Sequence, residues 1–134
     1  MSCIGVWRTR RNLVAVPVGA DGRAGLPLRV AGTDEAAHAL LAYLESVHRG
    51  AAFELVLADS LGRSAPVARV ALEYGVSLWL APDALVDAVR AVSGLATAPP
   101  PRTAAVLARL PGTSVFRPQL LRVTPGDRRQ LSLW

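Results

Sequence analysis

The feature of this sequence that most constrains its fold is a change in hydrophobic periodicity near residue 33. Before that point come three short apolar runs, at residues 3–8, 12–18 and 27–31. Asn12 stands in or near the first connection between them, and Gly19, Asp21 and Gly22 form the second. Runs of this kind are typical of strands joined by short turns. We therefore expect the chain to begin with an antiparallel meander of three strands.

The segment after residue 33 follows a helical period. Thr33 stands where a helix N-cap is expected, and Asp34 and Glu35 follow it in the first turn, where the helix dipole favours negative charge. We expect a helix over 34–48 whose apolar face packs on the sheet and consists of Ala37, Leu40, Leu41, Leu44 and Val47. His38 and His48 do not share a face of this helix, so the sequence predicts no metal site there.

The rest of the chain alternates apolar strands with helices. The expected elements are a strand at 53–60, a helix at 64–75, a strand at 76–82, a helix at 82–94, an extended proline-rich linker at 95–102 and a short helix at 103–112. This order predicts an α/β domain over residues 1–111, with a mixed five-stranded sheet and helices on its faces. Residues 112–134 are expected to form a C-terminal hairpin or arm.

Four stretches of the chain carry a more specific signal: "IGVWRTRRNLVAVPVGADGR", "TDEAAHALLAYL", "FELVLADSLGRSAPVARVALEYGVSLWLAP" and "RTAAVLARLP". In this order they resemble the N-terminal catalytic domain of the DEDD-type, RuvC-like transposases of insertion sequences. The resemblance covers residues 4–111 and implies a ribonuclease H-like fold. The stretch "TRRNLVAV" is also similar to short resolvase-like nucleases that process RNA.

The resemblance implies where catalytic acids would stand. Members of that family hold divalent metal with four acidic residues, because carboxylate oxygens offset the charge of the cations at the scissile phosphate. In this sequence Trp7 replaces the first acid, Asp59 fits the second and Thr103 stands near the last, and no Asp or Glu occurs between residues 88 and 126. We therefore expect Trp7, Asp59 and Thr103 to mark a vestigial site with no metal, no cofactor and no catalytic activity.

Two questions about this site stay open at the level of sequence. Trp7 either fills the pocket that the missing aspartate leaves or is an ordinary aromatic residue of the core or sheet edge. Asp59 could still hold one Mg²⁺ together with a substrate phosphate, since such ions often use only one or two protein carboxylates. The second possibility would make the chain a divergent metal-dependent nuclease.

The charge of the chain suggests a binding partner. All fifteen basic residues are arginine and the net charge is +5, a balance that attracts polyanions. Arg8, Arg10 and Arg11 crowd the first hairpin, and further arginines stand in the tail. We expect the hairpin arginines to bind DNA or RNA through phosphate contacts, the alternative being a solvated arginine-rich turn.

A second class of function is a protein-interaction or self-assembly module without nucleic-acid binding. The apolar stretches "LLRV" and "LSLW" of the tail are its candidates, and such strands could pair with a second copy to form a homodimer. Cys3 is the only cysteine, which excludes an internal disulfide and predicts a buried, inert thiol. Because no apolar run approaches the roughly 20 residues of a membrane span and no signal peptide is recognisable, we expect a cytoplasmic location.

Overall fold

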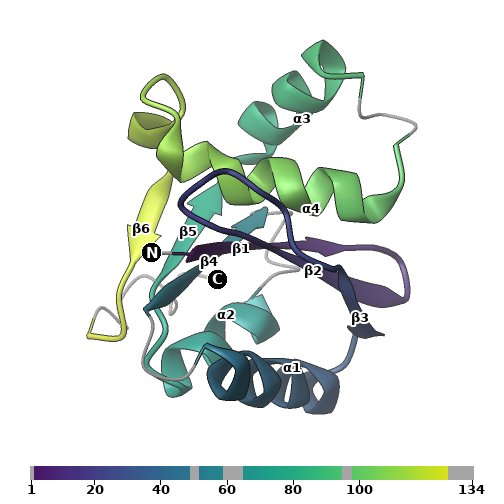
Figure 1. Ribbon diagram of the computed structural model, residues 1–134, viewed down its shortest axis with the longest axis vertical. Helices are drawn as coiled ribbons and strands as arrows, with labels where there is room; N and C mark the ends of the chain where they lie inside the picture. Colours follow the sequence, from purple (N-terminus) through teal and green to yellow (C-terminus); the bar gives the residue numbers. More distant parts are fainter. Residues whose placement is uncertain (1, 49–51, 59–64, 95–97, 127–134) are drawn as a thin grey trace.

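One mixed sheet organises the computed structural model, which describes residues 2–48, 52–58, 65–94 and 98–126 (Figure 1). Its strand order is β3-β2-β1-β4-β5-β6. The strands are β1 (Ser2–Arg8), β2 (Asn12–Val18), β3 (Leu28–Ala31), β4 (Phe53–Ala58), β5 (Leu78–Ala81) and β6 (Leu121–Val123). β1, β2 and β3 pair antiparallel, and β4 and β5 continue the sheet parallel to β1. The predicted meander followed by parallel strands is confirmed.

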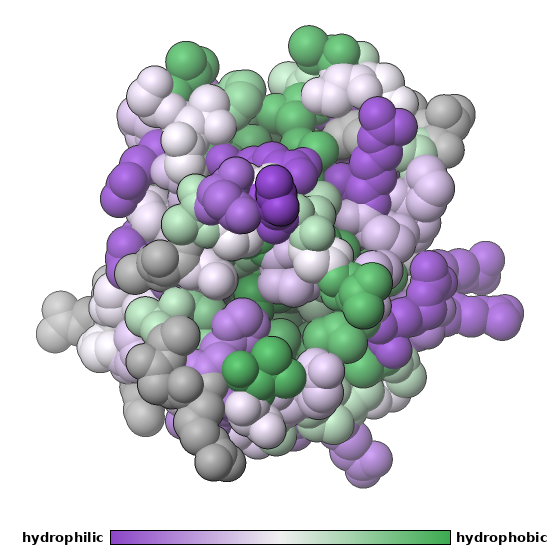
Figure 2. Space-filling view, in the orientation of Figure 1, coloured by the Kyte–Doolittle hydropathy of each residue, from purple (hydrophilic) through white to green (hydrophobic). Residues whose placement is uncertain are grey.

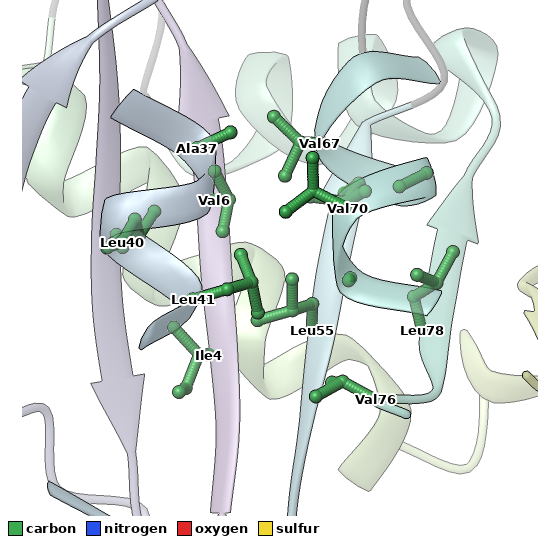
Figure 3. Close-up of a cluster of buried hydrophobic side chains, with 14 of the residues drawn as sticks. Ile4, Val6, Ala37, Leu40, Leu41, Leu55, Val67, Val70, Val76 and Leu78 are labelled. Carbon is green, nitrogen blue, oxygen red and sulfur yellow. The ribbon is translucent and has the colours of Figure 1, made fainter. Parts of the chain in front are cut away.

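Two helices cover one face of the sheet: α1 (Asp34–Val47) and α2 (Ala65–Glu73). Figure 3 shows Ile4 of β1, Leu55 of β4, Leu41 of α1 and Val70 of α2 in the core between these layers. The helix α1 begins as expected, because the side chain of Thr33 accepts a hydrogen bond from the backbone N–H of Ala36. Its buried residues are Ala37, Leu40, Leu41 and Leu44.

The apolar face predicted for α1 is one residue too long. Val47 has 58% of its surface exposed, because it belongs to the last turn of the helix, beyond the part that the sheet and α2 cover. Apolar spacing thus gives the direction of the buried face but not the point along the helix where burial ends.

The opposite face of the sheet carries α3 (Asp83–Val92) and α4 (Pro100–Arg109). α4 lies unusually close to β1, because a Cβ atom added at Gly5 would stand 1.8 Å from the carbonyl oxygen of Ala104 and 2.9 Å from the backbone nitrogen of Ala108. Only a residue without a side chain permits this approach. Gly5 and the small residues of α4 therefore set the distance between the helix and the sheet.

The prediction of an extended proline-rich linker at 95–102 is wrong for residues 100–102, which are helical. Pro100 and Pro101 form the first turn of α4, and Pro99 is its N-cap, so the helix begins three residues before the predicted start at 103. Proline is tolerated there because the first backbone N–H groups of a helix have no intrahelical acceptor. Of the remaining linker, residues 95–97 lie outside the described part of the chain.

The segment after α4 returns to the sheet. Two short 3₁₀ turns, Leu110–Gly112 and Arg117–Gln119, lead into β6, which pairs antiparallel with β5 and buries Val123 in the main core. The sheet accordingly has six strands where five were expected, and "LLRV" supplies the sixth. "LSLW" lies outside the described residues, so the hairpin and the division of the chain at residue 111 stay predictions.

Within the described ranges, no helix is long and apolar enough to cross a membrane.

Candidate functional site

The turn between β1 and β2 presents two of the predicted arginines to solvent. Thr9 and Asn12 close the turn: the Thr9 N–H donates to the Asn12 carbonyl at 2.9 Å, and the Asn12 N–H donates to the Thr9 hydroxyl at 3.0 Å. Arg10 and Arg11 occupy the two positions between them and are exposed. Arg8, at the end of β1, is partly buried. The short closed turn therefore holds a pair of guanidinium groups at the carboxyl end of β1.

Trp7 lies on the face of β1 that carries α4. It is partly buried and packs against the clusters that contain Leu107 and Ala104 of that helix. The guanidinium of Arg90 from α3 stands over its ring, with the Arg90 Cζ 5.0 Å from the ring centroid. An arginine placed in this way is attracted by the negative face of the indole. Trp7 therefore packs against apolar side chains of α4 and also lies next to a cation, and both interpretations of this residue from the sequence stay open.

Thr103 lies within the same region. It is buried in the first turns of α4 and lines a narrow crevice between α3 and α4 together with Val86, Val89 and Arg90. Arg90 therefore links the two predicted positions, since it contacts the Trp7 ring and shares the crevice with Thr103. Asp59, the third predicted member, lies outside the described residues.

A guanidinium, and no cluster of acids, stands beside Trp7 among the described residues. Among the described residues no group of three or more His, Cys, Asp or Glu side chains could hold a metal ion. An arginine has five N–H donors and no acceptor, so Arg90 cannot ligate a cation. A guanidinium can instead bind a phosphate in bidentate geometry.

Two arginines of this region were not expected from the sequence. Arg90 sits on the helix that was predicted at 82–94, but nothing in the local pattern indicates that its side chain reaches Trp7. Arg102 is exposed in the first turn of α4, a segment that was expected to be linker. Figure 1 shows the start of α4 and the β1–β2 turn on the same side of the molecule. In Figure 2 long hydrophilic side chains project from that side.

A second cluster of charges lies around β6. Glu54 of β4 is buried, and its Oε2 stands 2.8 Å from the Arg122 Nη2. The guanidinium groups of Arg117 and Arg122 stand 5.3 and 5.0 Å from the centroid of the Trp79 ring. These contacts hold the segment after α4 against the sheet. Arg117 and Arg122, the tail arginines that the structure describes, therefore stabilise the fold in addition to contributing surface charge.

Cys3 borders this second cluster and is partly buried. Burial raises the pKa of the Cys3 thiol above its ordinary value, and the Glu54 carboxylate acts in the same direction. The chain N-terminus and the two arginines oppose the increase without cancelling it. The thiol is therefore protonated at neutral pH, which agrees with an inert cysteine, although it is less buried than the sequence suggested.

No protein family profile matches this chain, and no curated protein matches it. A solved structure is similar to this chain: T. thermophilus RuvC in complex with a Holliday junction substrate. The two structures superpose with a TM-score of 0.54, and their sequences are 18% identical. The match covers 81% of this chain and 90% of the RuvC chain. At this identity the likeness concerns the fold alone, and it shows that the chain has the ribonuclease H-like fold.

Proposed function

We propose that this chain is a non-catalytic nucleic-acid-binding module that contacts the phosphate backbone. The observation that carries the proposal is the placement of Arg10 and Arg11 as the two exposed residues of the β1–β2 turn. This turn lies on the same side of the molecule as the start of α4, whose first turn contains the exposed Arg102 (Figure 1). Phosphate contacts from arginine give affinity that depends on salt and tolerates any sequence. The RuvC structure of the same fold is a complex with a Holliday junction, which is consistent with a nucleic-acid partner.

The absence of catalysis is part of the proposal and has its own support. Trp7 and the Arg90 guanidinium occupy the end of β1 where the resemblance to transposases implies a metal-binding aspartate. A fixed positive charge repels a divalent cation, and neither side chain offers an oxygen ligand. The alternative is a divergent nuclease built around Asp59.

A cleavage assay separates these two readings. Purified protein is incubated with branched DNA, duplex RNA and an RNA–DNA hybrid in the presence of Mg²⁺ or Mn²⁺, and we expect no cutting above that of a buffer control. Metal-dependent cutting that disappears in Asp59→Asn would contradict the proposal. Such a result would support the alternative hypothesis of a divergent nuclease built around Asp59.

A binding assay tests the surface. We expect the log of the affinity for a fluorescent oligonucleotide to fall linearly with the log of the salt concentration. In the double variant Arg10→Ala with Arg11→Ala, the slope should shrink by about 1.4 to 1.8, since each lost phosphate contact removes about 0.7 to 0.9. Adding Arg8→Ala should reduce the slope by about a further 0.7 to 0.9, the value for one phosphate contact. The loss should be equal for unrelated sequences of one length, because phosphates carry no sequence information.

A matched control keeps the change in net charge the same. Arg23→Ala with Arg69→Ala also removes two exposed arginines. Arg23 lies on the β2–β3 connection, and Arg69 lies on α2, on the face of the sheet that α1 also covers. We expect this pair to weaken binding much less than the turn pair. Equal losses in both pairs would show a general effect of net charge, and no binding by the wild type at low salt would refute the proposed function.

A further inference from the structure

The helix α3 carries an apolar stripe that the rest of the molecule covers only in part. Leu85, Val86, Val89 and Val92 recur at helical spacing along it. Leu85 and Val86 are buried, Val89 is partly buried and Val92 has 90% of its surface exposed. Burial therefore falls steadily along one face of the helix, because α3 leans away from the body toward its carboxyl end (Figure 1).

The divergence of α3 opens an apolar groove beside α4. Its volume is about 250 Å³, and its walls include Val89 and Val92 of α3, Val106 of α4, and Leu110 and Phe116 of the following segment. Figure 2 shows apolar side chains gathered at the top of the molecule, over α3 and the segment that follows α4. A volume below the roughly 300 to 1,000 Å³ of most small-molecule sites suits side chains of a macromolecular partner better than a cofactor.

One basic residue, Arg109, lines the groove, and its guanidinium also donates a hydrogen bond to the Gly22 carbonyl at 3.2 Å. All residues that line the groove lie between residues 88 and 116, a part of the sequence that contains no Asp or Glu, and Arg109 is the charged residue among them. The two acids of α3, Asp83 and Asp87, lie on the other side of the helix at 3.6 residues per turn. An occupant with acidic residues beside its apolar face would therefore complement the groove.

We propose that this groove docks an amphipathic helix of another protein, with bulky apolar side chains inserted between α3 and α4 and acidic residues along its edges. A helix laid into an apolar groove is a recurring mode of peptide recognition, and two diverging helices provide ridges for a third. A second copy of this chain fits less well, since two chains that each carry a net charge of +5 would meet beside Arg109. The groove is separate from the arginines of the β1–β2 turn.

Two designed peptides test this proposal. Both are helical 16-residue peptides with identically spaced leucines, and one carries glutamate where the other carries lysine beside the apolar face. We expect the glutamate peptide to bind the intact chain at least tenfold more tightly than the lysine peptide, measured by fluorescence anisotropy. In NMR spectra the glutamate peptide should shift the methyl resonances of four groove residues: Val89, Val92, Val106 and Leu110.

Surface variants connect the binding to the groove. Val92→Asp should weaken the binding of the glutamate peptide about tenfold or more. The fold should tolerate this change, because the Val92 side chain is highly exposed. Val47→Asp, at an exposed valine of α1 on the other face, should leave binding unchanged.

Three results would overturn the proposal. The first is failure of the glutamate peptide to bind at millimolar concentration. The second is equal binding of the two peptides. The third is a shift of the groove methyl groups by an oligonucleotide or by self-association, measured by sedimentation, in place of the peptide. The first two results do not bear on the salt dependence of Arg10 and Arg11, whereas an oligonucleotide that shifts the groove methyl groups would also move the nucleic-acid surface away from the turn. The failures of the two proposals are therefore distinguishable.

Discussion

The substitution Gly5→Ala tests the contact on which the site depends. Gly5 lies in the middle of β1, and α4 crosses it so closely that the new methyl carbon would stand 1.8 Å from the Ala104 carbonyl oxygen. A Cβ atom essentially never lies within 3.0 Å of such an atom, so α4 and β1 must move apart by at least 3.0 − 1.8 = 1.2 Å. Because the obstacle is backbone, no side-chain rotation can relieve it. The same helix carries Thr103 to the crevice beside Trp7.

The expected loss of stability follows from this displacement. Overpacking a core costs about 1 to 3 kcal/mol when side chains can adjust, and a gap of about 1 Å forfeits a quarter to a half of each dispersion contact. Since α4 buries Ala104, Ala105 and Ala108 against β1 and β2, we expect a loss of about 3 kcal/mol or more. That is a large fraction of the roughly 5 to 15 kcal/mol by which domains are stable.

Urea unfolding followed by circular dichroism measures this loss. With a denaturant slope of about 1 to 3 kcal/mol per molar, a loss of 3 kcal/mol lowers the midpoint by at least about 1 M. Gly112→Ala is the matched control, since a Cβ there meets nothing within 4 Å and should shift the free energy of unfolding by less than about 0.5 kcal/mol. A midpoint for Gly5→Ala equal to that of Gly112→Ala would refute the reasoning.

Three further predictions concern the core and the second charge cluster. Leu41→Asp places an unpaired charge at a fully buried position and should leave the chain unfolded by circular dichroism, whereas the exposed Val47→Asp should not. Arg122→Ala should cost about 3 kcal/mol in urea unfolding, because it strands the buried Glu54 carboxylate, and the double variant with Glu54→Leu should recover most of that loss. The raised pKa of Cys3 means that the folded chain holds the thiol proton more tightly than the unfolded chain does. Its contribution to stability is therefore present at neutral pH and is lost as the pH rises through the folded pKa, and Cys3→Ala should remove that part of the pH dependence of urea unfolding.

The sequence by itself determined the order and type of most elements. Strand and helix periods are local properties, so the meander, the helix that Thr33 caps and the buried face with Leu41 follow from residues close together in the chain. The turn that exposes Arg10 and Arg11 is equally local, because Thr9 and Asn12 close it by their own hydrogen bonds. The ribonuclease H-like fold was implied by the resemblance of four stretches to a known family, and the superposition on RuvC confirms it.

Only the tertiary structure decided what surrounds Trp7. Arg90 reaches its ring from a helix more than eighty residues away in sequence, and no periodicity encodes that contact. The sixth strand was missed for the same reason, since the edge of β5 that pairs β6 and the buried Glu54 that pairs Arg122 come from distant segments. The divergence of α3 is likewise a property of packing: its apolar stripe is continuous in the sequence, but the body of the molecule covers only the first part of it. Local spacing fixes which side of an element is apolar, whereas the depth of burial and the identity of the neighbour depend on how the elements meet in space.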